Sequence, residues 1–147
     1  MSADLDKVRR LVSADSGLVV LATTRTDNSV HASVVNAGVL PDPVTGEAVV
    51  GMVINGGARK LDYLRRTGRA TAVFRAGWQW ASVEGPLRIL GPDDPAADFD
   101  PAGLPKLFRD IFTSAGGTHD DFDTFDRVMA QERRVAVLIA PQKIAGS

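Results

Sequence analysis

The sequence has 147 residues with a formal net charge of -1, and it contains no cysteine. This length fits one folded domain spanning residues 1–147, large enough to bury a hydrophobic core without disulfides or a structural metal. The small net charge, with acidic and basic residues mixed along the chain, gives no field that would attract nucleic acid or an anionic membrane. The absence of cysteine excludes disulfides, thiol nucleophiles and thiolate metal ligands.

The sequence shows no targeting or membrane segment. Residues from Met1 to Lys7 lack the apolar stretch of a secretion signal. No apolar run elsewhere is long enough to cross a bilayer. We therefore expect a cytoplasmic protein without a membrane partner.

The first third of the chain shows one short helix followed by strand patterns. Leu5, Val8, Leu11 and Val12 follow helical spacing behind Asp4, which is a suitable N-cap. The segments that follow are rich in β-branched and apolar residues and are separated by turn-forming sequences. They predict strands at 17–24, 30–36 and 47–54.

The third predicted strand runs directly into Gly56-Gly57 and a short basic helix that begins near Arg59 and Lys60. Cations are disfavoured in the first turn of a helix, because the helix N-terminus itself carries partial positive charge. A bound phosphate would remove this conflict, since the free backbone N–H groups and the two cations would all favour it. A solvated basic helix without a ligand is the alternative, and this segment alone does not decide between the two.

Two further strands are predicted around a tight turn. Segments 69–75 and 78–90 have strand composition, and Ala76-Gly77 lies between them. Gly85-Pro86 predicts a bulge or a bend inside the longer strand.

The pattern changes after a cluster of helix- and strand-breaking residues at 91–95. Apolar residues then take helical spacing in two segments, and a final strand follows; these elements are predicted at 104–112, 122–129 and 134–140. Five or six antiparallel strands with helices around them predict a mainly β fold, a small β-barrel with peripheral helices.

The usual catalytic constellations are missing from the sequence. His31 lies in a predicted strand and His119 in a predicted loop, which is too few ligands for an ordinary zinc site, so we expect no metal. The glycine motifs of hydrolases, P-loop proteins and dinucleotide-binding proteins are also absent. The carboxylate pairs Asp93-Asp94 and Asp120-Asp121 lie where solvated helix caps are the expected role. If the protein is an enzyme, something other than these groups carries the chemistry.

Trp78 and Trp80 stand two residues apart in a predicted strand, which places both side chains on one face of the sheet. Two large rings on one face are most often buried in a core. Their position just after a turn, where the mouth of a barrel would lie, also suits the wall of a site for a flat ligand.

Taken in order, these segments resemble the flavin and deazaflavin oxidoreductases that share the split β-barrel of pyridoxamine 5'-phosphate oxidase, and especially their F420-dependent branch. The resemblance covers nearly the whole chain. It rests on 17–23, 33–36, Lys60, 64–66, 69–70, 77–78, 84–85, 125–129 and 132–135.

This resemblance implies a homodimer of split barrels, with two equivalent cofactor sites in grooves at the subunit interface. Lys60 matches the family's lysine that contacts the cofactor phosphate, and Trp78 matches an aromatic residue beside the deazaflavin groove. We expect the segment 104–132 to form a lid or an outer wall of the groove. The strand residues expected to flank the ring system are Ser33, Val35, Asn36 and Ile54.

The helix that would bind the phosphate departs from the family pattern. Family members often carry Arg-x-Lys-x-Arg, whereas this chain has Arg59 directly before Lys60 and has Asp62 in place of the second arginine. Because neighbouring residues on a helix point about 100° apart, Arg59 takes a different direction from the family's arginine. We still expect Arg59 to contact the cofactor. Because the arginines of this helix differ from the family pattern, we expect the affinity for the cofactor to differ as well.

The function implied by the resemblance is that of an F420-dependent oxidoreductase, which passes a hydride from the reduced deazaflavin to a small unsaturated or conjugated acceptor. Arg59, Arg65, Arg66 and Arg69 would hold the oligoglutamate tail of F420, unless they form a solvated helix face. F420 is preferred because segments 77–78 and 84–85 resemble that branch more closely. Two alternatives remain open: an FMN-dependent enzyme of the pyridoxamine 5'-phosphate oxidase type, and a non-catalytic binder of a flavin, deazaflavin or haem-like ligand.

Overall fold

The structure is a computed structural model that describes residues 4–147. None of its helices is long and apolar enough to span a membrane, within these residues. In chain order the elements are α1 (Leu5–Ala14), β1 (Leu18–Thr24), β2 (Val30–Pro41), β3 (Ala48–Ile54), α2 (Lys60–Thr67), β4 (Arg69–Ala76), β5 (Gln79–Leu90), the 3-10 helix η1 (Pro101–Gly103), α3 (Leu104–Ser114), α4 (Phe122–Gln131), β6 (Val135–Ile139) and β7 (Lys143–Gly146).

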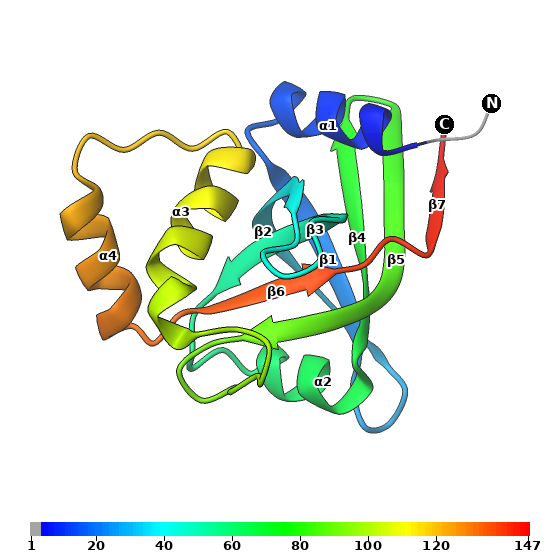
Figure 1. Cartoon of the computed structure of the whole chain (residues 1–147). Coiled ribbons are helices and arrows are strands. Elements are labelled where there is room, and N and C mark those ends of the chain that lie inside the picture. Colours follow the sequence, from blue (N-terminus) through cyan, green and yellow to red (C-terminus); the bar gives the residue numbers. More distant parts are fainter. Residues whose placement is uncertain (1–3) are drawn as a thin grey trace.

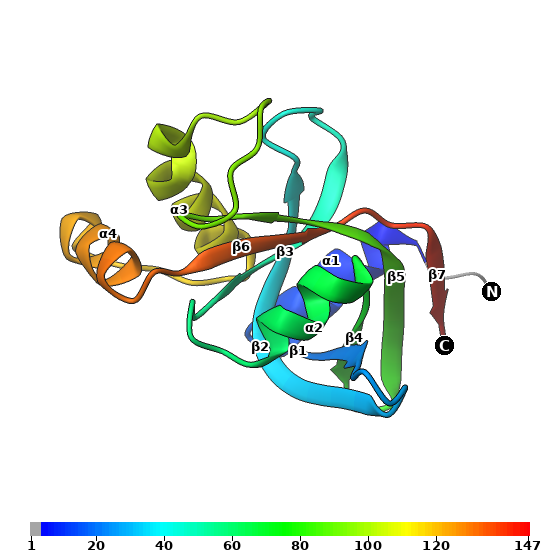
Figure 2. The same cartoon turned by 90° about the horizontal axis from the view of Figure 1, so that it is seen from below.

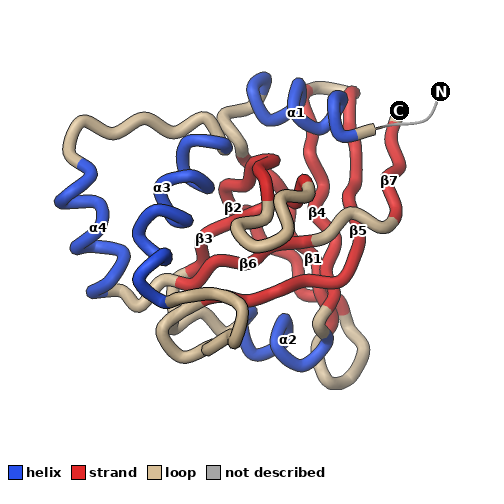
Figure 3. Tube along the Cα trace, in the orientation of Figure 1, coloured by secondary structure: helices blue, strands red, loops and turns tan. Residues whose placement is uncertain are grey.

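The strands form an antiparallel barrel with helices around it (Figures 1 and 3). The strand order is β4-β1-β2-β3-β6-β5, and the pairing of β4 with β5 closes the ring. β7 is added to β5 outside this ring. The mainly β fold with peripheral helices that the sequence predicts is confirmed.

Strand β5 changes its partner in the middle. Its residues up to Pro86 pair with β4, and its residues from Leu87 onward pair with β6. Gly85 lies at the change, and a Cβ there would collide with the carbonyl oxygen of Ala140. The bend expected at Gly85-Pro86 is therefore present, and the close approach of two backbones requires a glycine.

Helices α1 and α2 cover opposite ends of the barrel (Figures 1 and 2). α1 begins as predicted behind Asp4, whose carboxylate accepts the backbone N–H of Lys7 at 3.0 Å. α2 places Leu61 and Leu64 in the same buried cluster as Phe74 of β4. The interior of the barrel is therefore filled by strand side chains together with one face of each helix.

Helices α3 and α4 form a second apolar layer on the side of the barrel. Leu107, Phe108 and Ile111 of α3 are buried in one cluster with Leu138 of β6, and α4 contributes Phe125. Figure 1 shows α3 along the barrel wall and α4 farther out. Both helices that the sequence predicts after residue 95 are present.

Two strands differ from the sequence prediction. β2 continues to Pro41 instead of ending at Asn36, because its last five residues pair with β3. β7 was not predicted, since its four residues carry no alternating apolar pattern and it forms only by pairing with the edge of β5.

The two tryptophans also differ from the prediction. Ala76 pairs with Gln79, so Gly77 and Trp78 form a two-residue hairpin turn and Trp78 lies outside β5. Trp78 is 96% exposed, and Trp80 is 40% exposed. The core reading of Trp78 is therefore wrong, because the turn takes this residue out of the strand and leaves its ring in solvent.

We expect Gly85→Ala to lower the free energy of unfolding by roughly 1–3 kcal/mol, because the added Cβ forces two packed backbones apart. Urea unfolding followed by circular dichroism measures the change. Gly57→Ala is the control, since its Cβ would lie 3.5 Å from Asn55 Oδ1, an ordinary contact. Equal effects of the two substitutions would contradict the role of Gly85 in the bend.

Candidate functional site

The barrel opens where β2 and β3 part. The two strands pair along residues 37–41 of β2, but within the described residues 30–36 of β2 pair with β1 alone. β3 instead continues to Ile54 along β6. The edge of β2 that faces away from β1 is therefore open over residues 30–36.

Backbone polar groups of β2 point into this opening. Ala37 donates its N–H to the carbonyl oxygen of Gly17 at 2.9 Å, so its polar groups face β1. Successive residues of a strand present their N–H and C=O groups to alternate edges, so those of Asn36 and Val34 face the opening. Such groups can hydrogen-bond the polar edge of a planar ligand, as they would an added strand.

A groove of about 300 Å³ occupies the opening. Its walls come from β2, β3, the loop before α2, the start of α2, and the residue before β6. Its lining residues are Val34, Val35, Asn36, Val53, Ile54, Asn55, Ala58, Lys60 and Arg134. Four of these residues are predicted cofactor-binding residues, namely Val35, Asn36, Ile54 and Lys60.

Lys60 brings a positive charge to the groove. Its Nζ donates to the Ser33 hydroxyl at 2.7 Å, so Ser33 positions the ammonium from the neighbouring strand. Burial lowers the pKa of Lys60 below its ordinary value of 10.5, and no carboxylate within residues 4–147 offsets this effect. An ammonium has three N–H donors, so two remain for a ligand. A partly buried cation without a counter-ion fits an anion such as a phosphate.

The loop between β3 and α2 is held against the turn that follows α4. Asn55 Oδ1 accepts the Gly57 N–H at 2.9 Å, and the Gly56 N–H donates to the carbonyl oxygen of Glu132 at 3.3 Å. A Cβ on Gly56 would collide with the carbonyl oxygen of Arg133. Glycine at this position therefore lets the two backbones pack directly and fixes the approach to Lys60.

Two of the expected cofactor-binding residues do not line the groove. α2 begins at Lys60, and Arg59 is its exposed N-cap residue, whose side chain makes no capping hydrogen bond. Trp78 lies in the β4–β5 turn and not among the groove residues of its own chain. Cofactor roles for Arg59 and Trp78 stay predictions.

The other arginines proposed for the cofactor tail have partners within the chain. These partners lie in segments far from each arginine along the chain, so no local sequence pattern predicts them. The partners are Asp94 for Arg65 (2.8 Å), the carbonyl oxygen of Thr24 for Arg66 (2.6 Å) and Glu84 for Arg69 (3.6 Å).

Arg134 is a groove residue that sequence reasoning missed. Its Nε donates to Glu132 Oε2 at 2.7 Å, and the same oxygen lies 3.5 Å from Asn55 Nδ2. The segment 132–135 is part of the family resemblance, which could have drawn attention to Arg134. The resemblance assigns no role to this arginine, however.

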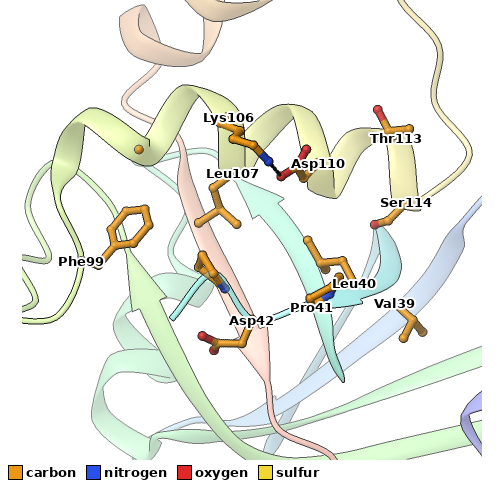
Figure 4. A pocket seen from close by; sticks show the side chains of 12 residues that line it. Val39, Leu40, Pro41, Asp42, Phe99, Lys106, Leu107, Asp110, Thr113 and Ser114 are labelled. Atoms are coloured by element: carbon orange, nitrogen blue, oxygen red, sulfur yellow. Dashed lines mark hydrogen bonds and ion pairs between the residues drawn. The ribbon is translucent and has the colours of Figure 1, made fainter. Parts of the chain in front are cut away.

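No residue of α3 or α4 lines the groove of its own chain, so the expectation that the segment 104–132 forms a lid or an outer wall stays a prediction. α3 borders a different cavity of about 650 Å³, between this helix and the end of β2 (Figure 4). The charged side chains there are already engaged: Lys106 pairs with Asp110 at 2.6 Å, and Asp42 accepts two backbone N–H groups. The Lys106 ammonium is therefore paired with a carboxylate, and the Asp42 carboxylate is held by the turn that follows β2.

The two histidines contact aromatic rings. The ring of His31 lies 5.5 Å from that of Tyr63, and the ring of His119 lies 5.9 Å from that of Phe125. Among residues 4–147 no group of three or more histidine and acidic side chains is arranged to hold a metal ion.

No family model matches this sequence. Among solved structures, the chain is similar to the conserved hypothetical protein Rv2991 from Mycobacterium tuberculosis, with a TM-score of 0.69 and 19% identity over 98% of this chain and 84% of that one. It is also similar to a pyridoxamine 5'-phosphate oxidase-related, FMN-binding protein from Nostoc punctiforme, with a TM-score of 0.65 and 13% identity over 96% of this chain and 79% of that one. The fold is therefore a split β-barrel, like that of the protein from Nostoc punctiforme.

An F420 reductase shares this split barrel, with a TM-score of 0.61 and 13% identity over 93% of this chain and 94% of that one. Identities this low show a common fold and do not transfer a ligand or a reaction. The chemistry of this protein therefore depends on the residues of its own groove.

We expect Lys60 to titrate below 10.5 in the free protein, because burial disfavours its charged form. Inorganic phosphate beside the ammonium would favour that form and raise the pKa. An NMR titration that follows the 13Cε chemical shift of Lys60 against pH, with and without phosphate, measures both effects. The signal of Lys60 is assigned by its loss in Lys60→Arg. A pKa that phosphate leaves unchanged would contradict an anion site here.

Proposed function

We propose that this protein is an F420-dependent oxidoreductase that works as a homodimer, with the cofactor ring in the groove between β2 and β3 and its phosphate at Lys60. When bound, reduced F420 supplies a hydride to a small unsaturated or conjugated acceptor. The observation that carries the proposal is the partly buried Lys60 ammonium, 2.7 Å from Ser33 and without a carboxylate partner in residues 4–147.

In this proposal, charged and polar residues of the groove bind the cofactor phosphate, and apolar residues of the groove bind the ring. Lys60 donates N–H groups to a phosphate oxygen, and Ser33 fixes the position of the ammonium. Val35 and Ile54 form an apolar wall for a flat ring, and the open backbone edge at Asn36 bonds the ring's polar side. The protein thus binds and orients the cofactor, which agrees with the lack of an acid–base constellation.

An exposed apolar face beside the groove supports the homodimer. Val20 of β1 lies directly opposite Val34 of β2, so their side chains share the outer face of the sheet, and Leu18 and Val30 lie on the same face. Val34 is 65% exposed and Val30 is 62% exposed. Contiguous apolar surface of this kind marks an interaction site. Because Val34 also lines the groove, a second copy docked here would complete the groove wall.

FMN is the second candidate cofactor, and one observation favours it. Arg65, Arg66 and Arg69, which would hold the oligoglutamate tail of F420, are engaged within the chain. FMN carries a single phosphate and no such tail, so Lys60 with the neighbouring Arg59 would supply the required charge. The structural neighbours include both an FMN-binding protein and an F420 reductase.

Titration of the protein with F420 and with FMN, followed by ring fluorescence at fixed salt, tests the proposal. We expect F420 to bind more tightly than FMN. Lys60→Ala should weaken F420 binding by roughly 10- to 150-fold, since it removes a charge-assisted hydrogen bond worth about 1.5–3 kcal/mol.

Lys106→Ala is the control for this titration, because it removes an exposed lysine that pairs with Asp110 on α3, away from the groove. It should bind F420 as the wild type does. Unchanged affinity in Lys60→Ala would remove the phosphate role of Lys60, and tighter binding of FMN would favour the second candidate. Binding without turnover across a panel of conjugated acceptors would indicate a carrier.

We expect a dimer for the wild type and a monomer for Val20→Glu, because an unpaired carboxylate is strongly disfavoured in an apolar interface. Sedimentation velocity measures the change, and Val44→Glu, in the exposed turn between β2 and β3, is the control. Val20 does not line the groove, so weaker F420 binding by the monomer would show that the second copy completes the site. A dimer that survives Val20→Glu would contradict this interface.

A further inference from the structure

A third cavity, distinct from the groove and from the cavity between α3 and the end of β2, lies on the other side of the turn between α4 and β6. It has a volume of about 330 Å³ and lies between α3, α4 and the loop before η1. We call it the helical cavity. Arg134 lines both the helical cavity and the groove. The residues that line the helical cavity are Pro92, Pro101, Leu104, Pro105, Phe108, Asp126, Met129, Ala130, Arg133 and Arg134.

The helical cavity has apolar walls, and its charged groups are already paired. Asp126 accepts two hydrogen bonds from Arg109, at 3.0 and 2.5 Å. Arg133 pairs with Asp93 at 2.5 Å. A charged occupant would find no free counter-charge among these groups, so an uncharged, mostly apolar molecule fits the cavity best. Its apolar walls come from Leu104, Phe108, Met129 and three prolines.

Arg134 offers hydrogen-bond donors to such an occupant. Its Nε and Nη2 both contact a single oxygen of Glu132, at 2.7 and 2.5 Å. A guanidinium has five N–H donors, and the described residues supply no acceptor for Nη1. A carbonyl oxygen on the occupant would accept this charge-assisted hydrogen bond.

The backbone beside Arg134 has an uncommon conformation. Arg133 has a φ of 50°, in the left-handed region that residues other than glycine seldom adopt. Arg133 is the left-handed residue that ends α4, since the Arg134 N–H donates to the carbonyl oxygen of Met129 at 3.0 Å and the Arg133 N–H donates to that of Ala130 at 3.1 Å. Gly56 packs against the carbonyl oxygen of Arg133. The position of Arg134 is therefore tied to the loop that leads to Lys60.

From these contacts we propose that the helical cavity binds a small uncharged carbonyl compound, with its apolar body against Leu104, Phe108 and Met129 and its oxygen on Arg134. Since a water molecule occupies about 30 Å³ in the liquid, a volume of about 330 Å³ holds roughly ten heavy atoms. A conjugated ketone of this size is one such compound, and it binds apart from the hydride acceptor, because the helical cavity lies across the turn from the groove proposed to hold the ring. Arg134 is then the residue that selects carbonyl compounds over hydrocarbons.

Carvone, a conjugated ketone, and limonene, a hydrocarbon with the same carbon skeleton, are the probes that test this. We expect carvone to shift the methyl NMR signal of Met129, which Met129→Leu assigns, and limonene to bind more weakly. Arg134→Gln should weaken carvone binding roughly tenfold through loss of a charge-assisted hydrogen bond and leave limonene binding unchanged.

Arg127→Gln is the matched control, because Arg127 is an exposed arginine of α4 whose side chain bonds Thr124 of the same helix. It should leave carvone binding unchanged. Arg134→Lys keeps a cationic donor and should keep the preference for carvone, which gives a second variant if Arg134→Gln fails to fold. Equal binding of the two probes to the wild type, or a Met129 signal that neither probe moves, would overturn the proposal.

Titration of the same samples with F420 separates this proposal from the proposed function. F420 binding without a carvone effect at Met129 would overturn the helical cavity alone. A carvone effect that depends on Arg134, in a protein that binds neither F420 nor FMN, would support the cavity and overturn the proposed function.

Discussion

The barrel depends on the close crossing of two backbones at Gly85. The chain leaving β6 passes over β5 there, and it is held by hydrogen bonds from the Ala140 N–H to the Pro86 carbonyl oxygen at 2.8 Å and from the Gln142 N–H to the Glu84 carbonyl oxygen at 2.9 Å. This crossing lets one strand pair with β6 at one end and with β4 at the other. Closure by β4 and β5 leaves the break in pairing on the opposite side of the ring, between β2 and β3. The groove exists because the barrel closes at one seam and opens at another.

Much of the fold could be predicted from the sequence, because its elements have strong local signals. The Asp4 cap, the apolar periodicity of the helices and the glycine at the bend in β5 each act within a few residues. β7 could not be predicted, since its four residues form a strand only by pairing with β5. Trp78 was predicted to begin a strand, with Ala76-Gly77 as the turn, but the turn is Gly77-Trp78. The two alternatives differ by one position in the sequence, which local patterns do not resolve.

The candidate site was predicted in part for a similar reason. Ser33, Val35, Asn36, Ile54 and Lys60 meet at the opening because the first three lie on one strand and the last two flank one loop. The engagement of the arginines of α2 and β4 could not be predicted, because it depends on contacts between segments far apart in the chain. Arg134 was missed for the same reason, since its place in the groove follows from the packing of the loop before α2 against the turn after α4.

The open edge of β2 has a consequence for the handling of the protein. Residues 30–36 carry an unpaired backbone edge, two strongly exposed valines and no formally charged side chain. An uncharged β-branched edge of this kind is a template for strand addition between chains, which leads to aggregation. On the proposed function, a ligand in the groove would cover the edge and a second copy would cover the adjoining face, so both would act as protection against misassembly. The yield of soluble protein would then depend on the supply of ligand during expression as well as on the stability of the fold.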